Sequence, residues 1–158
     1  MYDTILIPLD GSPLAELVLP HAVGIAKQFN SLVLLLQVVP TLQELVREAM
    51  PITAEPAVAV AQVSVEMASE QYKAQAQGAH DYLEGMRRRL EEQGLTVEAV
   101  VLEGNPADCI IRCAKERDAG LIALSTHGRS GLGRLVFGSV ADRVLREAHR
   151  PLLIIRPS

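Results

Sequence analysis

Residues 121–140 of the chain, LIALSTHGRSGLGRLVFGSV, determine how the rest of the sequence is interpreted. The stretch opens with the apolar run Leu121–Leu124, which predicts a short buried strand. Three closely spaced glycines follow, and a helix is predicted to begin near Gly138-Ser139. Because glycine-rich loops that lead into a helix N-terminus bind anions in many proteins, the stretch predicts a phosphate site.

Backbone geometry is the physical basis of this prediction. Glycine lacks a β-carbon, so Gly128 and Gly131 can adopt positive φ angles and let backbone N–H groups approach an anion. The first N–H groups of the following helix lack helical acceptors, and the Ser139 hydroxyl can donate as well. A surface loop with glycine turns is the competing interpretation. The position after an interior strand favours the phosphate site.

Further apolar runs predict the sheet to which this strand belongs. Residues 4–9 and 32–39 are nearly unbroken apolar runs of strand length. Continuous apolar strands are covered on both faces, as in a parallel sheet between two layers of helices. Residues 97–101 alternate instead and predict an edge strand, and residues 151–156 supply a fifth strand.

Capping signals and helical spacing predict helices between the strands. Ser12-Pro13 combines an N-cap with a first-turn proline, and helical spacing of apolar residues continues to about Phe29. A long helix is predicted from about Met67 to Gln93. Another opens at Asn105-Pro106, again a cap residue followed by proline.

The segment from about residue 40 to residue 66 interrupts this alternation. Pro40, Pro51 and Pro56 break any long helix, so the segment is predicted to be a variable, partly ordered insertion. Apolar residues between 42 and 49 suit a short helix. The valines between 58 and 65 leave an extra strand or a dimer contact open.

Together these elements predict the α/β class: an open, doubly wound, five-stranded parallel sheet with helices on both faces and strand order 3-2-1-4-5. In this order the first and fourth strands are neighbours whose following helices pack on opposite faces. Ligands of such sheets bind outside the carboxyl ends of the strands at this switch point. Residues 8–12 and 125–139 meet there.

Composition limits the class of protein further. The 158 residues, 49% hydrophobic and 22% charged, suit one compact domain spanning residues 1–158. A net charge of −4 without a basic block disfavours nucleic acid as a partner. No apolar run approaches the roughly 18 residues that span a bilayer, so no membrane partner is expected and the cytoplasm is the predicted location.

The two cysteines, Cys109 and Cys113, lie four residues apart in a predicted helix and therefore share one face. Two small buried side chains are the favoured interpretation, and a redox pair or two-ligand metal site is the alternative. The four scattered histidines offer no spacing that completes a zinc site. No metal ligand is therefore predicted.

The glycine-rich stretch resembles the nucleotide-binding motif of the universal stress protein family, G-x2-G-x9-G-[S/T]. Gly128 matches the second glycine, residues 129–137 match the nine-residue spacer, and Gly138-Ser139 closes the motif. Ser125 takes the place of the first glycine. Neither a P-loop nor the G-x-G-x-x-G of dinucleotide folds is present. The segments ILIPLDGS, LLLQVVP and RPLLIIRP also resemble the family, so the resemblance covers nearly the whole chain.

The resemblance implies an ATP-binding protein, with or without Mg²⁺, that acts as a homodimeric sensor or regulator in the stress response. It implies a dimer contact through Pro151–Arg156. Pro8 and Asp10 border adenine and ribose in this interpretation, and Val38 meets the adenine edge through its backbone. The full set of predicted nucleotide-binding residues is Pro8, Leu9, Asp10, Val38, Ser125, Thr126, His127, Gly128, Arg129, Ser130, Gly131, Gly138, Ser139, Val140 and Ala141.

Other functions stay open at this point. Ser125 favours a family member that binds no nucleotide and works through dimerisation and partner contacts. A slow nucleotide hydrolase on the same fold is the other alternative, although no residue spacing supports His127 as a general base, and no catalytic residue is predicted. Asp10 suits a ribose hydroxyl or a hydrated Mg²⁺, and capping of the first helix is its alternative role.

Overall fold

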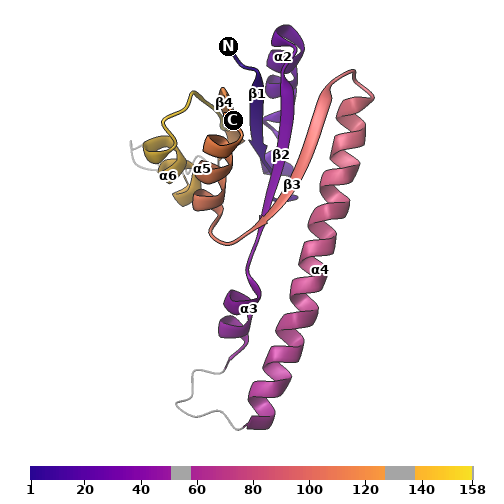
Figure 1. The fold of residues 1–158 in the computed structure, drawn as a ribbon, viewed down its shortest axis with the longest axis vertical. Helices are drawn as coiled ribbons and strands as arrows, with labels where there is room; N and C mark the ends of the chain where they lie inside the picture. Colours follow the sequence, from indigo (N-terminus) through magenta and orange to yellow (C-terminus); the bar gives the residue numbers. More distant parts are fainter. Residues whose placement is uncertain (51–57, 127–137, 158) are drawn as a thin grey trace.

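The computed structural model describes residues 1–50, 58–126 and 138–157. Five parallel strands form one sheet in the order β3-β2-β1-β4-β5, which confirms the predicted fold (Figure 1). Neighbouring strands are in register from Thr4 opposite Leu32 onward, and β1 lies at the centre. The strands are β1 (Thr4–Pro8), β2 (Leu32–Val39), β3 (Thr96–Glu103), β4 (Leu121–Ser125) and β5 (Leu152–Ile155).

Helices cover both faces of the sheet, as the continuous apolar strands predict. On one face α2 and the C-terminal half of α4 bury Leu83 and its neighbours, and on the other α5 and α6 pack. Successive residues of β1 divide between the two layers: Ile5 and Ile7 belong to the first and Leu6 to the second, all fully buried. The helices are α1 (Pro13–Glu16), α2 (Leu19–Phe29), α3 (Leu42–Ala49), α4 (Val58–Glu91), α5 (Pro106–Glu116) and α6 (Ser139–Glu147).

The helix predicted from Ser12 to about Phe29 is in fact two helices. Ser12 caps α1 as expected, since its Oγ accepts a hydrogen bond from the Ala15 N–H at 3.1 Å. Helical structure stops after Glu16 and resumes in α2, because Pro20 has no N–H to donate to the Glu16 carbonyl. The α1 helix is therefore a single turn.

The long helix α4 begins at Val58 rather than near Met67, so the alternative of an extra strand over the valines is wrong. In this part of the helix Ser64 and Ala68 are buried, 7% and 0% exposed, and α3 packs against α4. At about 1.5 Å per residue the 34 residues of α4 span about 51 Å. Figure 1 shows that its N-terminal half, with α3 beside it, extends beyond the sheet.

The helix α5 has the cap that the sequence predicts, because Asn105 Oδ1 accepts a hydrogen bond from the Asp108 N–H at 3.2 Å. Cys109 and Cys113 lie in its buried face, where burial raises the pKa of both thiols. The Cys109 Sγ donates to the Glu103 carbonyl at 3.3 Å. These contacts are those of small core side chains. Within residues 1–50, 58–126 and 138–157, no helix has the length and hydropathy needed to cross a bilayer.

Candidate functional site

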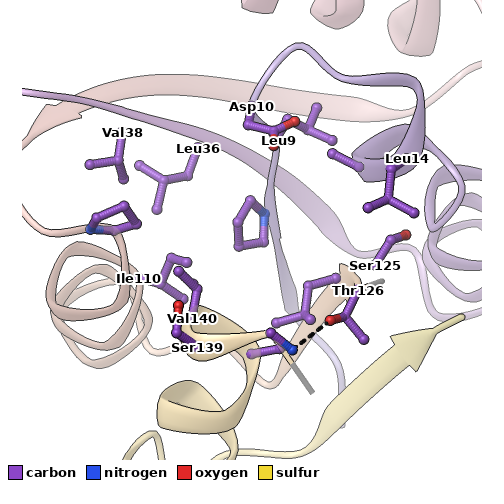
Figure 2. A pocket seen from close by; sticks show the side chains of 16 residues that line it. Leu9, Asp10, Leu14, Leu36, Val38, Ile110, Ser125, Thr126, Ser139 and Val140 are labelled. Atoms are coloured by element: carbon purple, nitrogen blue, oxygen red, sulfur yellow. Dashed lines mark hydrogen bonds between the residues drawn. The ribbon is translucent and has the colours of Figure 1, made fainter. Parts of the chain in front are cut away.

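A cavity of about 330 Å³ lies where the carboxyl ends of β1 and β4 meet (Figure 2). The two strands are adjacent in the sheet, and the chain leaves them toward opposite faces, into α1 and α6. This is the switch point at which open α/β sheets bind ligands. The residues that line the cavity are Pro8, Leu9, Asp10, Leu14, Ala15, Leu36, Val38, Pro106, Ile110, Leu124, Ser125, Thr126, Gly138, Ser139, Val140 and Ala141.

Most of the predicted binding residues meet at this one cavity. Residues 127–131 lie outside the described part of the chain, so their place relative to the cavity stays a prediction. The ten predicted residues that line the cavity are Pro8, Leu9, Asp10, Val38, Ser125, Thr126, Gly138, Ser139, Val140 and Ala141. The lining residues that the sequence did not indicate are Leu14, Ala15, Leu36, Pro106, Ile110 and Leu124. Leu124 lies next to the end of a predicted strand and Pro106 opens a predicted helix, so the positions of these two residues were available signals.

One side of the cavity is formed by apolar side chains alone. Leu36, Val38 and Ile110 form the apolar side, which suits a planar base or another apolar group. Leu14 and Ser125 lie on the opposite side in Figure 2. Among the described lining residues, Asp10 carries the only formal charge.

The Asp10 carboxylate is fixed by the loop after β1. Its Oδ1 accepts a hydrogen bond from the Ser12 N–H at 2.9 Å, and the residue is exposed at the cavity. Ser12, and not Asp10, is the N-cap of α1, so the alternative role of Asp10 as the helix cap is wrong. A carboxylate held in this place can accept hydrogen bonds from ligand hydroxyls.

The helix α6 directs its N-terminus toward the cavity. Helical bonding begins with the Asp142 N–H donating to the Gly138 carbonyl at 2.9 Å, so the N–H groups of residues 139–141 have no acceptor within the helix. The Gly138 N–H donates instead to Thr126 Oγ1 at 3.0 Å, the dashed line in Figure 2. The first backbone N–H group that is available to an anion is therefore that of Ser139, and not that of Gly138, with which the motif closes.

The backbone conformation at Gly138 does not require glycine. Its φ is −58°, which any residue can adopt. A β-carbon there would come 3.4 Å from Thr126 Oγ1, the atom that accepts the Gly138 hydrogen bond. Glycine at this position keeps the contact with Thr126 uncrowded.

Ser125, which replaces the first glycine of the motif, lies on the α1 side of the cavity. Side chains alternate along β4, so that Leu124 belongs to the α5 and α6 layer and Ser125 faces the other way. Figure 2 shows its side chain on the side of Leu14 and away from Ser139. Its Oγ is buried without a hydrogen-bond partner among the described residues. The serine side chain thus leaves the N-terminus of α6 unobstructed.

The fold and the cavity define an α/β protein with a cavity at the switch point of a five-stranded parallel sheet. A sequence model of the Universal stress protein family matches residues 1–156. Universal stress protein MJ0531 of Methanocaldococcus jannaschii is 35% identical over 156 residues, which cover 99% of this chain and 83% of that protein. The chain belongs to the universal stress protein family.

Solved structures agree on the fold. Hypothetical protein MJ0577 superposes with a TM-score of 0.78 at 23% identity, covering 100% of this chain and 98% of that one. A universal stress protein family protein from Arabidopsis thaliana with AMP bound has a TM-score of 0.65 at 17% identity, with coverages of 98% and 92%. A universal stress protein in complex with cAMP has a TM-score of 0.59 at 21% identity, covering 99% of this chain and 98% of that one.

Proposed function

We propose that this protein binds ATP in the cavity between β1 and β4 and acts as a homodimeric sensor or regulator in the stress response. The observation that carries the proposal is the convergence, on one cavity, of an apolar side, the Asp10 carboxylate and the N-terminus of α6. Two proteins of the same fold hold adenine nucleotides, AMP in one and cAMP in the other. The volume of about 330 Å³ is in the range of small-molecule sites.

The three parts of the cavity correspond to the three parts of a nucleotide. Adenine would lie against Val38 and Ile110, where apolar surface is available. The ribose hydroxyls would donate to Asp10. The phosphates would face the N–H groups of residues 139–141, where the helix dipole favours negative charge. Mg²⁺ would accompany the phosphates. The chain is expected to use ATP as a bound signal, and hydrolysis is not required for that role.

The dimer and the location belong to the same proposal. A second copy would pair along β5, through Pro151–Arg156, because this strand is an apolar, partly exposed edge of the sheet. The cytoplasm and the absence of nucleic-acid partners stay predictions of the sequence. Mass spectrometry of ligand extracted from the purified protein distinguishes a nucleotide-binding protein from one that works through dimerisation alone.

Calorimetric titration with ATP and AMP, with and without Mg²⁺, tests the nucleotide site directly. The variant Val140→Trp places a large ring in the cavity and should weaken ATP binding at least tenfold, because Val140 lines the cavity and is only partly buried. Leu145→Trp is the matched control, since Leu145 is on the same helix and 44% exposed. Absence of binding to the wild-type protein, or equal affinity in both variants, contradicts the proposal.

A further inference from the structure

The side chain of Tyr82 joins the long helix α4 to the single-turn helix α1. Its hydroxyl donates to Glu16 Oε1 at 2.9 Å, although the two residues are 66 positions apart in the sequence. Both side chains are partly buried. The Tyr82 ring packs against the same hydrophobic layer as Ala15, which also lines the cavity. One side chain of α4 thus contacts the element that forms one side of the site.

The helix α1 depends on such contacts for its position. A helix of four residues has no stability of its own, because the cost of nucleation is recovered only over many more residues. Within the chain it is held by the Ser12 cap, and Ser12 in turn is bonded to Asp10. Leu14 and Ala15 project from this one turn into the cavity lining. The contacts that fix α1 therefore also fix the side of the cavity that Leu14 and Ala15 form.

The Tyr82 hydroxyl is a permanent donor in this place. Burial raises the pKa of Tyr82 well above its ordinary value, and the hydrogen bond to Glu16 and the negative charges of Glu16 and Asp10 raise it further. A series of contacts therefore runs from α4 through Glu16, α1 and Ser12 to the carboxylate at the cavity.

We propose that Tyr82 is a positioning residue of the ligand site, whose hydrogen bond to Glu16 holds α1 where Leu14 and Ala15 close the cavity and Asp10 faces the ligand. The identity of the ligand rests on the function proposed above, but the position of α1 does not. Coupling between two sites is reciprocal. If the contact between α1 and α4 raises the affinity for the nucleotide by some factor, the bound nucleotide stabilises that contact by the same factor. Occupancy of the cavity is thereby transmitted to the long helix.

Calorimetric ATP titration of Tyr82→Phe tests the effect on binding. The variant keeps the ring and removes the donor, so we expect ATP affinity to fall about fivefold. Glu16→Ala should have a similar effect, the double variant should add little to either, and Glu16→Gln should retain affinity because it keeps an acceptor. Tyr72→Phe is the matched control: Tyr72 also lies on α4 and bonds a glutamate, Glu103 of β3, and lines no part of the cavity.

Hydrogen exchange of the nucleotide-free protein gives a second measurement, which does not depend on the ligand. Peptides covering residues 13–17 should exchange several times faster in Tyr82→Phe than in the wild type or in Tyr72→Phe. If the wild-type protein binds no ATP, the proposed function fails, and the exchange rates alone decide the role of Tyr82. Unchanged exchange in Tyr82→Phe, or faster exchange with unaltered ATP affinity, overturns the positioning role.

Discussion

Among single residues, Thr126 makes contacts that join three elements at the cavity. The residue is 5% exposed, its N–H donates to the Ile155 carbonyl of β5 at 3.0 Å, and its Oγ1 accepts a hydrogen bond from the Gly138 N–H at 3.0 Å. The hydroxyl therefore fixes the start of α6 relative to the end of β4.

Replacing Thr126 with valine tests this role. Valine has nearly the same shape but lacks the acceptor, so the Gly138 N–H loses its partner. We expect the free energy of unfolding to fall by about 1 kcal/mol, the usual net value of one hydrogen bond. Urea unfolding followed by circular dichroism measures the change. Thr126→Ser keeps the hydroxyl, so its free energy of unfolding should be closer to that of the wild type. A larger loss of stability in Thr126→Ser than in Thr126→Val would show that packing, and not the hydrogen bond, causes the effect.

The residues of the site were predictable where they follow directly from chain position. Asp10 and Ser125 come at strand ends, and Ser139 begins a helix, so the parallel topology alone brings them to one edge. Leu14 and Ile110 line the cavity because α1 and α5 pack over it, and this packing depends on contacts distant in the sequence. Local pattern carries no signal for such contacts.

Among the secondary-structure elements, the N-terminal half of α4 shows where sequence patterns were insufficient. The valines between residues 58 and 65 have high β propensity, and their spacing does not separate strand from helix. Tertiary packing favours the helix, since α3 packs against α4 and the small residues Ser64 and Ala68 of α4 are buried. The break between α1 and α2 has a local cause, Pro20, and was accessible from the sequence.

The C-terminal part of α4 carries a charge cluster that predicts an acid dependence of stability. Arg87 and Arg88 donate hydrogen bonds to the Glu84 carboxylate at 2.7 and 3.0 Å. These bonds lower the pKa of Glu84 from 4.5 to about 2. A carboxyl whose pKa is lowered on folding stabilises the folded state above its unfolded pKa. This contribution is complete above about pH 4.5 and is lost as the pH falls toward 2.

The variant Glu84→Gln should remove this dependence. Between pH 4.5 and pH 2 its melting temperature should fall less steeply than that of the wild type, while the two curves run parallel above that window. Thermal unfolding at a series of pH values and low ionic strength measures the difference. High salt should reduce it, because the cluster is exposed to solvent and therefore screened. If the melting temperatures of the two proteins change in parallel over the whole pH range, the ion pairs of Glu84 contribute nothing to stability.

For the molecule as a whole, the sheet order was predictable because burial differs between strands. The runs that became β1 and β2 are almost continuously apolar, which requires cover on both faces, and the alternating run became the edge strand β3. The second edge, β5, is apolar along its whole length, and Leu152–Ile155 are all partly exposed. An apolar edge of this kind is a surface on which another strand pairs.

The register of β5 indicates how to test the dimer proposed through this edge. The Pro151 and Ile155 carbonyls accept hydrogen bonds from the N–H groups of Ile122 in β4 and of Thr126 just after it. Because backbone groups alternate in direction along a strand, those of Ile154 point away from the sheet. Ile154→Pro removes an outward N–H, which an edge strand tolerates, and should convert the dimer to a folded monomer. Ile154→Ala loses the same side chain but keeps the N–H, and should stay dimeric. Light scattering after size-exclusion chromatography measures both, and a monomeric wild type or a dimeric proline variant would exclude pairing through β5.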